Sequence, residues 1–167
     1  MSHAEHRAVA PSHVRCYVIT VSDSRTEDTD TGGRLLRELL TEGGHPVLGH
    51  SIVRDDPAIL RAAIERQLNM SEVQAVITTG GTGISRRDGS YEVVTELLDK
   101  RLDGFGELFR SLSFAEIGPS AMLSRACAGT ARGKILVSLP GSQNAVRLGL
   151  TKLILPELGH LVREVTR

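Results

Sequence analysis

The sequence has no surplus of charge of either sign, no tryptophan and no long apolar run. Its 167 residues include 20 basic and 20 acidic side chains, so bulk electrostatics do not favour nucleic acid or an anionic membrane as a partner. Its apolar runs are far shorter than the roughly 20 residues that cross a bilayer, so no membrane span is predicted. Any phosphate ligand must therefore be held by a local arrangement of donors.

Cysteine and histidine are few and scattered. Cys16 and Cys127 form no C-x-x-C pair, and no signal peptide is recognised, so we expect reduced, packed cysteines in a cytoplasmic protein. His45, His50 and His160 do not have a metal-ligand spacing such as H-x-x-x-H, and each is interpreted as a surface or packing residue. No histidine-bound zinc is predicted.

The length of the chain indicates one domain with one core. Residues 1–13 are small and polar, have no hydrophobic period and contain His3, His6 and His13. This composition predicts a flexible N-terminal extension, followed by a single domain at residues 14–167.

Apolar β-branched segments alternate with amphipathic ones along the rest of the chain. This pattern predicts an α/β fold in which helices cover both faces of an open, mainly parallel sheet. About five strands and six helices are expected. Strands are predicted at residues 14–21, 47–53, 75–79 and 135–139, the last entered through a small hairpin within residues 124–141. Helices are expected around residues 35–40, after Pro57, and around residues 93–98, 103–114, 145–154 and 155–165.

Polar or glycine-rich loops follow four of the predicted strands. Ligands bind beyond the carboxyl ends of parallel strands, so we expect these loops to meet on one rim. They are Ser22-Asp23-Ser24, Arg54-Asp55-Asp56, Gly80-Gly81-Thr82-Gly83, which Thr79 precedes, and Pro140-Gly141-Ser142.

The glycine loop at residues 80–83 is the most informative of these junctions. Glycine allows positive φ and close backbone approach, so successive N–H groups can form an anion-binding nest to which Thr82 adds a hydroxyl. The alternative is a simple turn from a strand into a helix, and the neighbouring Arg86-Arg87-Asp88 favours a site. Because the chain lacks a P-loop lysine and a G-x-G-x-x-G, neither a P-loop NTPase nor a nicotinamide dehydrogenase is favoured.

Asp55 and Asp88 are expected at the ends of adjacent strands. Two carboxylates there can share Mg²⁺ with substrate phosphates, and phosphoryl or nucleotidyl transfer needs such a clamp more than a covalent nucleophile. The alternative role is helix capping, for which Asp56, next to Pro57, is the more favoured residue.

Five motifs occur in a fixed order: VSDSR (21–25), TTGGTGISRRD (78–88), DGFGELFR (103–110), LSRACAG (123–129) and LPGS (139–142). Together they resemble the MoaB/MogA family of molybdenum cofactor biosynthesis proteins, over about residues 14–165. The resemblance implies a three-layer α/β/α molybdopterin-binding fold that assembles as a homotrimer or homohexamer. The apolar segment at residues 148–162 is expected to lie partly between subunits.

The resemblance also implies an activity and a set of site residues. Mg-ATP and molybdopterin would give adenylylated molybdopterin and pyrophosphate, and a separate molybdate-insertion protein, in transient contact, would act next. By position, Asp55 and Asp88 are the carboxylates of catalysis and of metal or pterin binding, and the glycine loop is on the pterin side. The same cleft would be lined by Ser22, Asp23, Thr79, Ser124, Pro140, Gly141 and Ser142.

Two segments depart from the family pattern. Gly89-Ser90-Tyr91 stands where the family usually has Val-Thr-Pro, and Gln143 replaces the final proline of the PGSP turn. A catalytically silent molybdopterin-binding carrier that uses the same cleft is therefore the alternative function. A third interpretation is an unrelated Rossmann-like module whose loops are simple turns.

Overall fold

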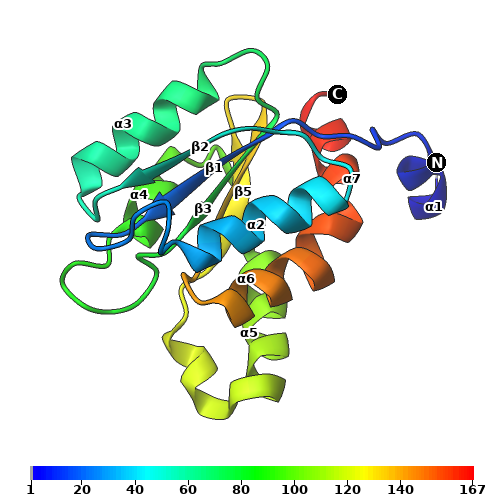
Figure 1. The fold of residues 1–167 in the computed structure, drawn as a ribbon. Helices are drawn as coiled ribbons and strands as arrows, with labels where there is room; N and C mark the ends of the chain where they lie inside the picture. Colours follow the sequence, from blue (N-terminus) through cyan, green and yellow to red (C-terminus); the bar gives the residue numbers. More distant parts are fainter. Residues whose placement is uncertain (1) are drawn as a thin grey trace.

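A mixed six-stranded sheet forms the centre of the computed structural model, which describes residues 2–167 (Figure 1). The strand order is β2-β1-β3-β6-β5-β4. The four strands β1 (Cys16–Val21), β2 (Val47–Val53), β3 (Ala75–Thr79) and β6 (Lys134–Leu139) are parallel, whereas β5 (Cys127–Ala131) and β4 (Lys100–Arg101) are antiparallel.

Helices cover both faces of this sheet, so the predicted three-layer α/β/α architecture is confirmed. One face packs against α2 (Thr31–Glu42), α5 (Asp103–Ile117), α6 (Gln143–Gly149) and α7 (Leu155–Val165). The other face packs against α3 (Pro57–Leu68) and α4 (Ser90–Leu97). Successive residues of β3 alternate between the two cores, because strand side chains point to opposite faces: Ala75 and Ile77 join the first and Val76 the second.

Most of the predicted elements are confirmed, and the differences have local causes. The first strand begins at Cys16 and not at Val14, because the Val14 N–H donates to Nδ1 of His45 and so leaves the sheet ladder. The two-residue strand β4 was not predicted, since Lys100 and Arg101 are both exposed and carry no hydrophobic signal. A 3₁₀ helix, η1 (Gly118–Leu123), follows α5.

The C-terminal helical region contains one widened turn. A π-helical segment, η2 (Leu150–Ile154), joins α6 to α7. Pro156, in the first turn of α7, has no N–H to donate, and such a break in the regular ladder is compatible with a π turn. Within residues 2–167, no helix combines the length and the apolar character needed to cross a membrane.

The predicted N-terminal extension contains a short helix, α1 (His3–Ala8). Ser2 and Glu5 form a reciprocal capping box at its start, and Arg7 donates to the Pro156 carbonyl at 2.8 Å and pairs with Glu157 at 3.0 Å. Capping and polar contacts therefore form this helix without a hydrophobic period. Residue 1 lies outside the described residues, and the flexibility of the extension stays a prediction.

The strand order corrects one expectation about the site. Strand β1 lies between β2 and β3, so Asp55 and Asp88 do not follow adjacent strands. The chain leaves β1 towards β2 but leaves β3 towards β6, which makes the β1/β3 boundary the topological switch point where ligands bind in open α/β sheets. The register aligns the strand ends there, with Thr20 opposite Thr79 and Thr79 opposite Leu139.

Candidate functional site

The four predicted loops meet at the carboxyl edge of the parallel strands. The Ser22 N–H donates to the Val53 carbonyl at 2.9 Å, which joins the loops after β1 and β2. The Gly80 N–H donates to the Leu139 carbonyl at 2.9 Å, which joins the loops after β3 and β6. The predicted rim therefore exists, although its side chains divide into two groups on the two sides of the glycine loop.

Gly80 and Gly81 form a turn that only glycine fits. Their φ angles are +100° and +68°, which L side chains rarely adopt. A Cβ at Gly80 would also overlap the Val21 carbonyl oxygen, and one at Gly81 would overlap the hydroxyl of Ser90. The buried Ser90 hydroxyl donates to the Gly80 carbonyl at 2.8 Å, and the Ser90 backbone N–H donates to the Gly81 carbonyl at 3.0 Å. Ser90 belongs to the Gly89-Ser90-Tyr91 segment that departs from the family pattern, and its two hydrogen bonds stabilise the turn.

Not all the N–H groups of residues 80–83 are available for the predicted anion nest. The Gly80 N–H is used by Leu139, so it is not free for a ligand. In the described part of the chain, the N–H groups of Gly81, Thr82 and Gly83 donate to no protein acceptor. The nest is reduced to these three groups, and anion binding there stays a prediction.

Three aspartates gather on the α3 and α4 side of the loop. The Asp55 N–H donates to Oδ1 of Asp23 at 3.0 Å, and the Gly89 N–H donates to Oδ1 of Asp55 at 3.4 Å. A Cβ at Gly81 would lie 3.1 Å from Oδ2 of Asp55 and 3.3 Å from Val21, so the loop after β3 crosses the end of β1. This crossing brings Asp88 beside Asp55 although their strands are not neighbours.

The electrostatics of the three carboxylates differ. Partial burial raises the pKa of Asp55, and the charges of Asp88 and Asp23 raise it further against the Gly89 N–H. Hydrogen bonds from Arg87, at 2.7 and 3.1 Å, lower the pKa of Asp23, with help from the Asp55 N–H. Asp23 thus has a cationic partner, whereas a bound cation would stabilise the ionised form of Asp55.

The capping alternative applies to Asp56 alone. Its side chain accepts from the Ile59 N–H at 3.1 Å and caps α3, as predicted. Asp88 accepts from the Ser85 N–H at 2.9 Å inside the loop, and the start of α4 at Gly89 has no side-chain cap. Neither Asp55 nor Asp88 therefore caps the helix that follows it.

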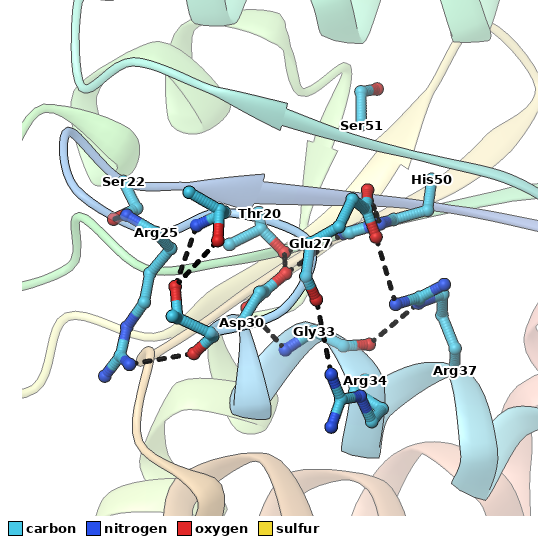
Figure 2. Close-up of polar contacts among 12 residues, drawn as sticks. Thr20, Ser22, Arg25, Glu27, Asp30, Gly33, Arg34, Arg37, His50 and Ser51 are labelled. Atoms are coloured by element: carbon cyan, nitrogen blue, oxygen red, sulfur yellow. Dashed lines mark hydrogen bonds and ion pairs between the residues drawn. The ribbon is translucent and has the colours of Figure 1, made fainter.

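A pocket of about 280 Å³ lies on the α2 side of the glycine loop, at the β1/β3 switch point. Five predicted site residues line it: Ser22, Thr79, Gly80, Gly141 and Ser142. Five further lining residues were not among the predicted site residues: Thr20, Val21, Arg25, Asp30 and Gly32. Figure 2 shows several of them at the end of β1 and the start of α2. The acidic residue before a helix was the available signal for Asp30, whose side chain accepts from the Gly33 N–H at 2.9 Å.

The other predicted site residues lie outside this pocket. Asp23, Asp55, Asp88, Gly81 and Gly83 belong to the carboxylate side. Thr82 is buried, and its carbonyl accepts from the Arg125 N–H at 3.3 Å, which places Ser124 near it. The Pro140 carbonyl accepts from the hydroxyl of Thr79, a lining residue of the pocket, at 3.0 Å.

Arg125 is a further residue of the site that the sequence reasoning did not identify. Its guanidinium donates to the Gly83 carbonyl at 2.6 and 3.0 Å and to the Asp88 carbonyl at 3.2 Å. It also pairs with Glu92 and lies 5.2 Å from the ring centroid of Tyr91. Arg125 therefore ties together the two ends of the loop that carries Asp88, and Tyr91 forms part of this clamp.

Gln143, the second departure, begins α6 and is exposed. Ser142 precedes it as the N-cap, and the Ser142 hydroxyl accepts from the Ala145 N–H at 3.2 Å. The loss of a proline therefore leaves the cap of this helix intact.

Comparisons with known proteins agree with this geometry. The family described as "Probable molybdopterin binding domain" matches residues 17–160. Molybdenum cofactor biosynthesis protein B of Bacillus cereus is 52% identical over 100% of this chain and 99% of its own length, and the Bacillus subtilis protein of that name is 46% identical over the same shares.

Solved structures give the same result. A crystal structure of molybdenum cofactor biosynthesis protein B superposes with a TM-score of 0.90 at 53% identity, covering 93% of this chain and 98% of the other. The tungsten cofactor synthesizing protein MoaB from Pyrococcus furiosus has a TM-score of 0.81 at 39% identity, covering 95% and 100%. Residues 17–160 match the model of that domain, and the chain belongs to the MoaB/MogA family of molybdenum cofactor biosynthesis proteins.

Proposed function

We propose that this protein adenylylates molybdopterin: it binds molybdopterin and Mg-ATP at the rim described above and transfers AMP to the terminal phosphate of the pterin. An oxygen of that phosphate forms a bond to the α-phosphorus of ATP. The bond from the α-phosphorus to the bridging oxygen breaks, and pyrophosphate leaves with the electron pair. The product, adenylylated molybdopterin, would pass to a molybdate-insertion protein through transient contact. The cytoplasmic location expected from the sequence stays a prediction.

The observation that carries this proposal is the Asp55–Asp88 arrangement beside the glycine loop. Burial and the neighbouring carboxylates raise the pKa of Asp55, which is the electrostatic situation that a divalent cation relieves. Carboxylate oxygens suit Mg²⁺, which needs only one or two protein ligands when substrate phosphates and water complete its shell. Asp55 and Asp88 would hold this ion, and when bound it would neutralise charge that grows on the leaving pyrophosphate.

The remaining residues would bind and orient the two substrates. The free N–H groups of residues 81–83 suit a phosphate oxygen, and Thr82 is buried at the same turn. On the other side of the loop, Ser22, Arg25 and Ser142 line the 280 Å³ pocket with hydroxyl and guanidinium donors. Such fixed donors contribute by position, because phosphoryl-type transfers depend on alignment and charge stabilisation.

A silent molybdopterin carrier is the second candidate function. The observation behind it is that two segments beside the site, Gly89-Ser90-Tyr91 and Gln143, depart from the family pattern. The test is pyrophosphate release from Mg-ATP by the purified protein with molybdopterin present, together with a separate measurement of pterin binding. Release that requires the pterin supports the enzyme, whereas pterin binding without release supports the carrier.

We also propose a closed homotrimer or homohexamer, whose contact surface would include α5 and η1. Within residues 148–162, Leu150, Ile154 and Leu158 are at most 2% exposed and belong to the core, whereas Leu153, Leu155 and Leu161 are half-buried. Large exposed apolar side chains instead gather on α5 and η1, which extend away from the sheet (Figure 1). They are Leu108, Phe114, Ile117, Met122 and Leu123. An apolar patch of this kind is typical of a subunit interface.

A further inference from the structure

We propose that His50 is a positioning residue for the pocket at the ends of β1 and β3. It holds the Asp30 carboxylate and the Thr20 hydroxyl in place, and through them the start of α2, against which a phosphate-bearing ligand such as ATP or molybdopterin would lie. This proposal rests on the proposed ligand-binding function of the pocket, and not on adenylyl transfer itself.

His50 lies on the edge strand β2, yet its side chain is only 5% exposed. Its Nε2 atom is 2.9 Å from the Thr20 hydroxyl and 3.2 Å from Oδ2 of Asp30 (Figure 2). Its Nδ1 atom is 3.2 Å from Oε1 of Glu27, an ion-pair distance without an aligned hydrogen bond. The ring therefore stands between two carboxylates, inside the layer formed by β1, β2 and α2.

The hydrogen-bond arrangement determines which atoms carry protons. The Thr20 hydroxyl donates its one hydrogen to Oδ2 of Asp30 at 2.6 Å, so towards His50 it acts as an acceptor. Nε2 of His50 must then carry a hydrogen. Nδ1 faces the carboxylate of Glu27, which when ionised only accepts. His50 therefore directs an N–H donor towards Thr20 and Asp30, and its second ring nitrogen lies at ion-pair distance from Glu27.

His50 gives the buried Asp30 carboxylate a basic partner at 3.2 Å. The Asp30 side chain is 3% exposed, and burying an unpaired carboxylate is strongly unfavourable. The other nearby cationic side chains contact Glu27. Arg37 lies 3.7 Å from the Glu27 carboxylate, and Arg34 donates to the Glu27 backbone carbonyl at 3.3 Å. Among the described residues, His50 is therefore the basic side chain within ion-pair distance of Asp30.

The network connects directly to the pocket wall. Asp30 caps α2 through the Gly33 N–H at 2.9 Å, and a Cβ at Gly33 would overlap both Asp30 and Thr20. A Cβ at Gly32, which lines the pocket, would lie only 2.6 Å from the Gly141 oxygen on the opposite wall. The spacing between these two walls thus depends on the position of Asp30. His50 does not itself line the pocket, so it acts through Asp30 and Thr20.

The decisive comparison uses His50→Leu, the milder His50→Gln, and His45→Gln as a matched control. His45 is also a buried histidine at a polar contact, but its Nδ1 accepts from the Val14 N–H at 3.0 Å, whereas His50 contacts Thr20 and Asp30. Because a misplacement of about 1 Å at a site can cost on the order of 100-fold in rate, we expect the smaller shift caused by His50→Leu to weaken molybdopterin or ATP binding by about 10-fold. His50→Gln should have a smaller effect and His45→Gln none.

A ligand-free measurement keeps the proposal separate from the proposed function. In His50→Leu, amide hydrogen exchange should accelerate at residues 31–35 and 141–145, at the two pocket walls. In His45→Gln, acceleration should be confined to the neighbourhood of residues 14–16. The double variant Asp30→Asn/His50→Leu should unfold less readily than His50→Leu alone, because it removes the unpaired charge. Unchanged exchange at residues 31–35 in a folded His50→Leu protein overturns the proposal. If exchange accelerates but the parent protein binds neither ligand, His50 positions the pocket and the proposed function fails.

Discussion

The Gly89 N–H donates to the carboxylate of Asp55 at 3.4 Å, across the end of the strand that separates their two loops. This contact places Asp55 beside the residue that follows Asp88, and it opposes the rise in the pKa of Asp55 that burial and Asp88 produce. The two carboxylates therefore act on one another although their strands are not adjacent. The first two predictions test what this proximity does.

Replacement of Asp55 by asparagine should separate chemistry from binding. If Asp55 and Asp88 hold Mg²⁺ in the transition state, loss of the clamp costs several kcal/mol, on the order of 10³-fold in rate. We expect Asp55→Asn to abolish nearly all pyrophosphate release while molybdopterin binding survives, and Asp88→Asn to impair both, because Asp88 lies within the glycine loop. The control is Asp56→Asn, which should be mild in both assays, because asparagine caps a helix about as well as aspartate does. Near-normal turnover in Asp55→Asn at saturating Mg-ATP would favour the silent carrier.

The same variant should change the pH dependence of stability in a defined direction. The pKa of Asp55 is raised, so the folded protein binds this proton more tightly than the unfolded chain does. The resulting contribution to the free energy of unfolding is complete below the ordinary pKa of aspartate, and it is lost as pH rises through the raised pKa.

The asparagine introduced by Asp55→Asn does not titrate, so the variant does not lose this contribution as pH rises. The free energy of unfolding of Asp55→Asn, minus that of the parent, should therefore increase between about pH 3 and about pH 7. Urea unfolding in the presence of a chelator at the two pH values measures the difference. Added Mg²⁺ at neutral pH should reduce it, because the ion stabilises the parent alone. A relative stability that falls with rising pH would contradict the raised pKa.

Much of the fold was predictable from the sequence because the relevant signals are local. The run Ala75–Thr79 is buried throughout and was predicted with its observed bounds, and Asp56 caps α3 because it immediately precedes Pro57. Strand order is not a local property. Nothing in the spacing of residues 47–79 shows that β1 lies between β2 and β3, so Asp55 and Asp88 were assigned to adjacent strands.

The site was predicted less completely for the same reason. The glycine loop is recognisable from its composition, whereas the use of the Gly80 N–H by Leu139 depends on a strand some 60 residues away in the sequence. His50 was interpreted as an ordinary surface or packing residue, since its two carboxylate neighbours come from the loop and helix start after β1. Long-range polar pairs of this kind carry no periodic signal.

Gly83 offers a cleaner test of the glycine loop than Gly81. A side chain at Gly81 would be strained by its φ of +68°, so loss of binding there would not distinguish a nest from a turn. Gly83 has no positive φ, and a Cβ there would lie 2.7 Å from Oδ2 of Asp88. We expect Gly83→Ala to displace Asp88 and to weaken molybdopterin binding while the protein stays folded.

The matched control is Gly104→Ala in α5, where a Cβ would meet no atom within 4 Å. It should bind molybdopterin like the parent. Equal affinity in the two alanine variants would reduce the loop to a turn. Sulfate or phosphate bound to the N–H groups of residues 81–83 in crystals of the protein would support the nest independently.

The assembly should depend on the apolar side chains of α5 and η1. We expect a trimeric or hexameric mass by light scattering at micromolar concentration. Phe114→Asp and Met122→Asp, at positions 60% and 73% exposed, should lower that mass, because a charge buried in an interface is unfavourable. Ile84→Asp is the control, since Ile84 is 71% exposed but lies in the glycine-loop segment. A monomeric mass for the parent protein would remove this proposal.

Arg125 should hold the loop that carries Asp88 in its working position. Its planar guanidinium donates to the Gly83 carbonyl through two nitrogens and also reaches the carbonyl of Asp88. Lysine keeps the charge but has no fork geometry, so it cannot join both carbonyls in the same way. Arg125→Lys should therefore loosen the loop, with turnover and molybdopterin affinity each reduced on the order of 10-fold. Hydrogen exchange at residues 83–88 should accelerate, which a purely electrostatic role would not cause.

Arg132→Lys is the matched control, because Arg132 also makes a forked contact, to Glu65 at 2.9 Å and Asn69 at 2.7 Å, but does so away from the loop. If Arg125→Lys and Arg132→Lys retain the same affinity and the same exchange at residues 83–88, the position of Asp88 is set by Ser85 and the glycine turn alone.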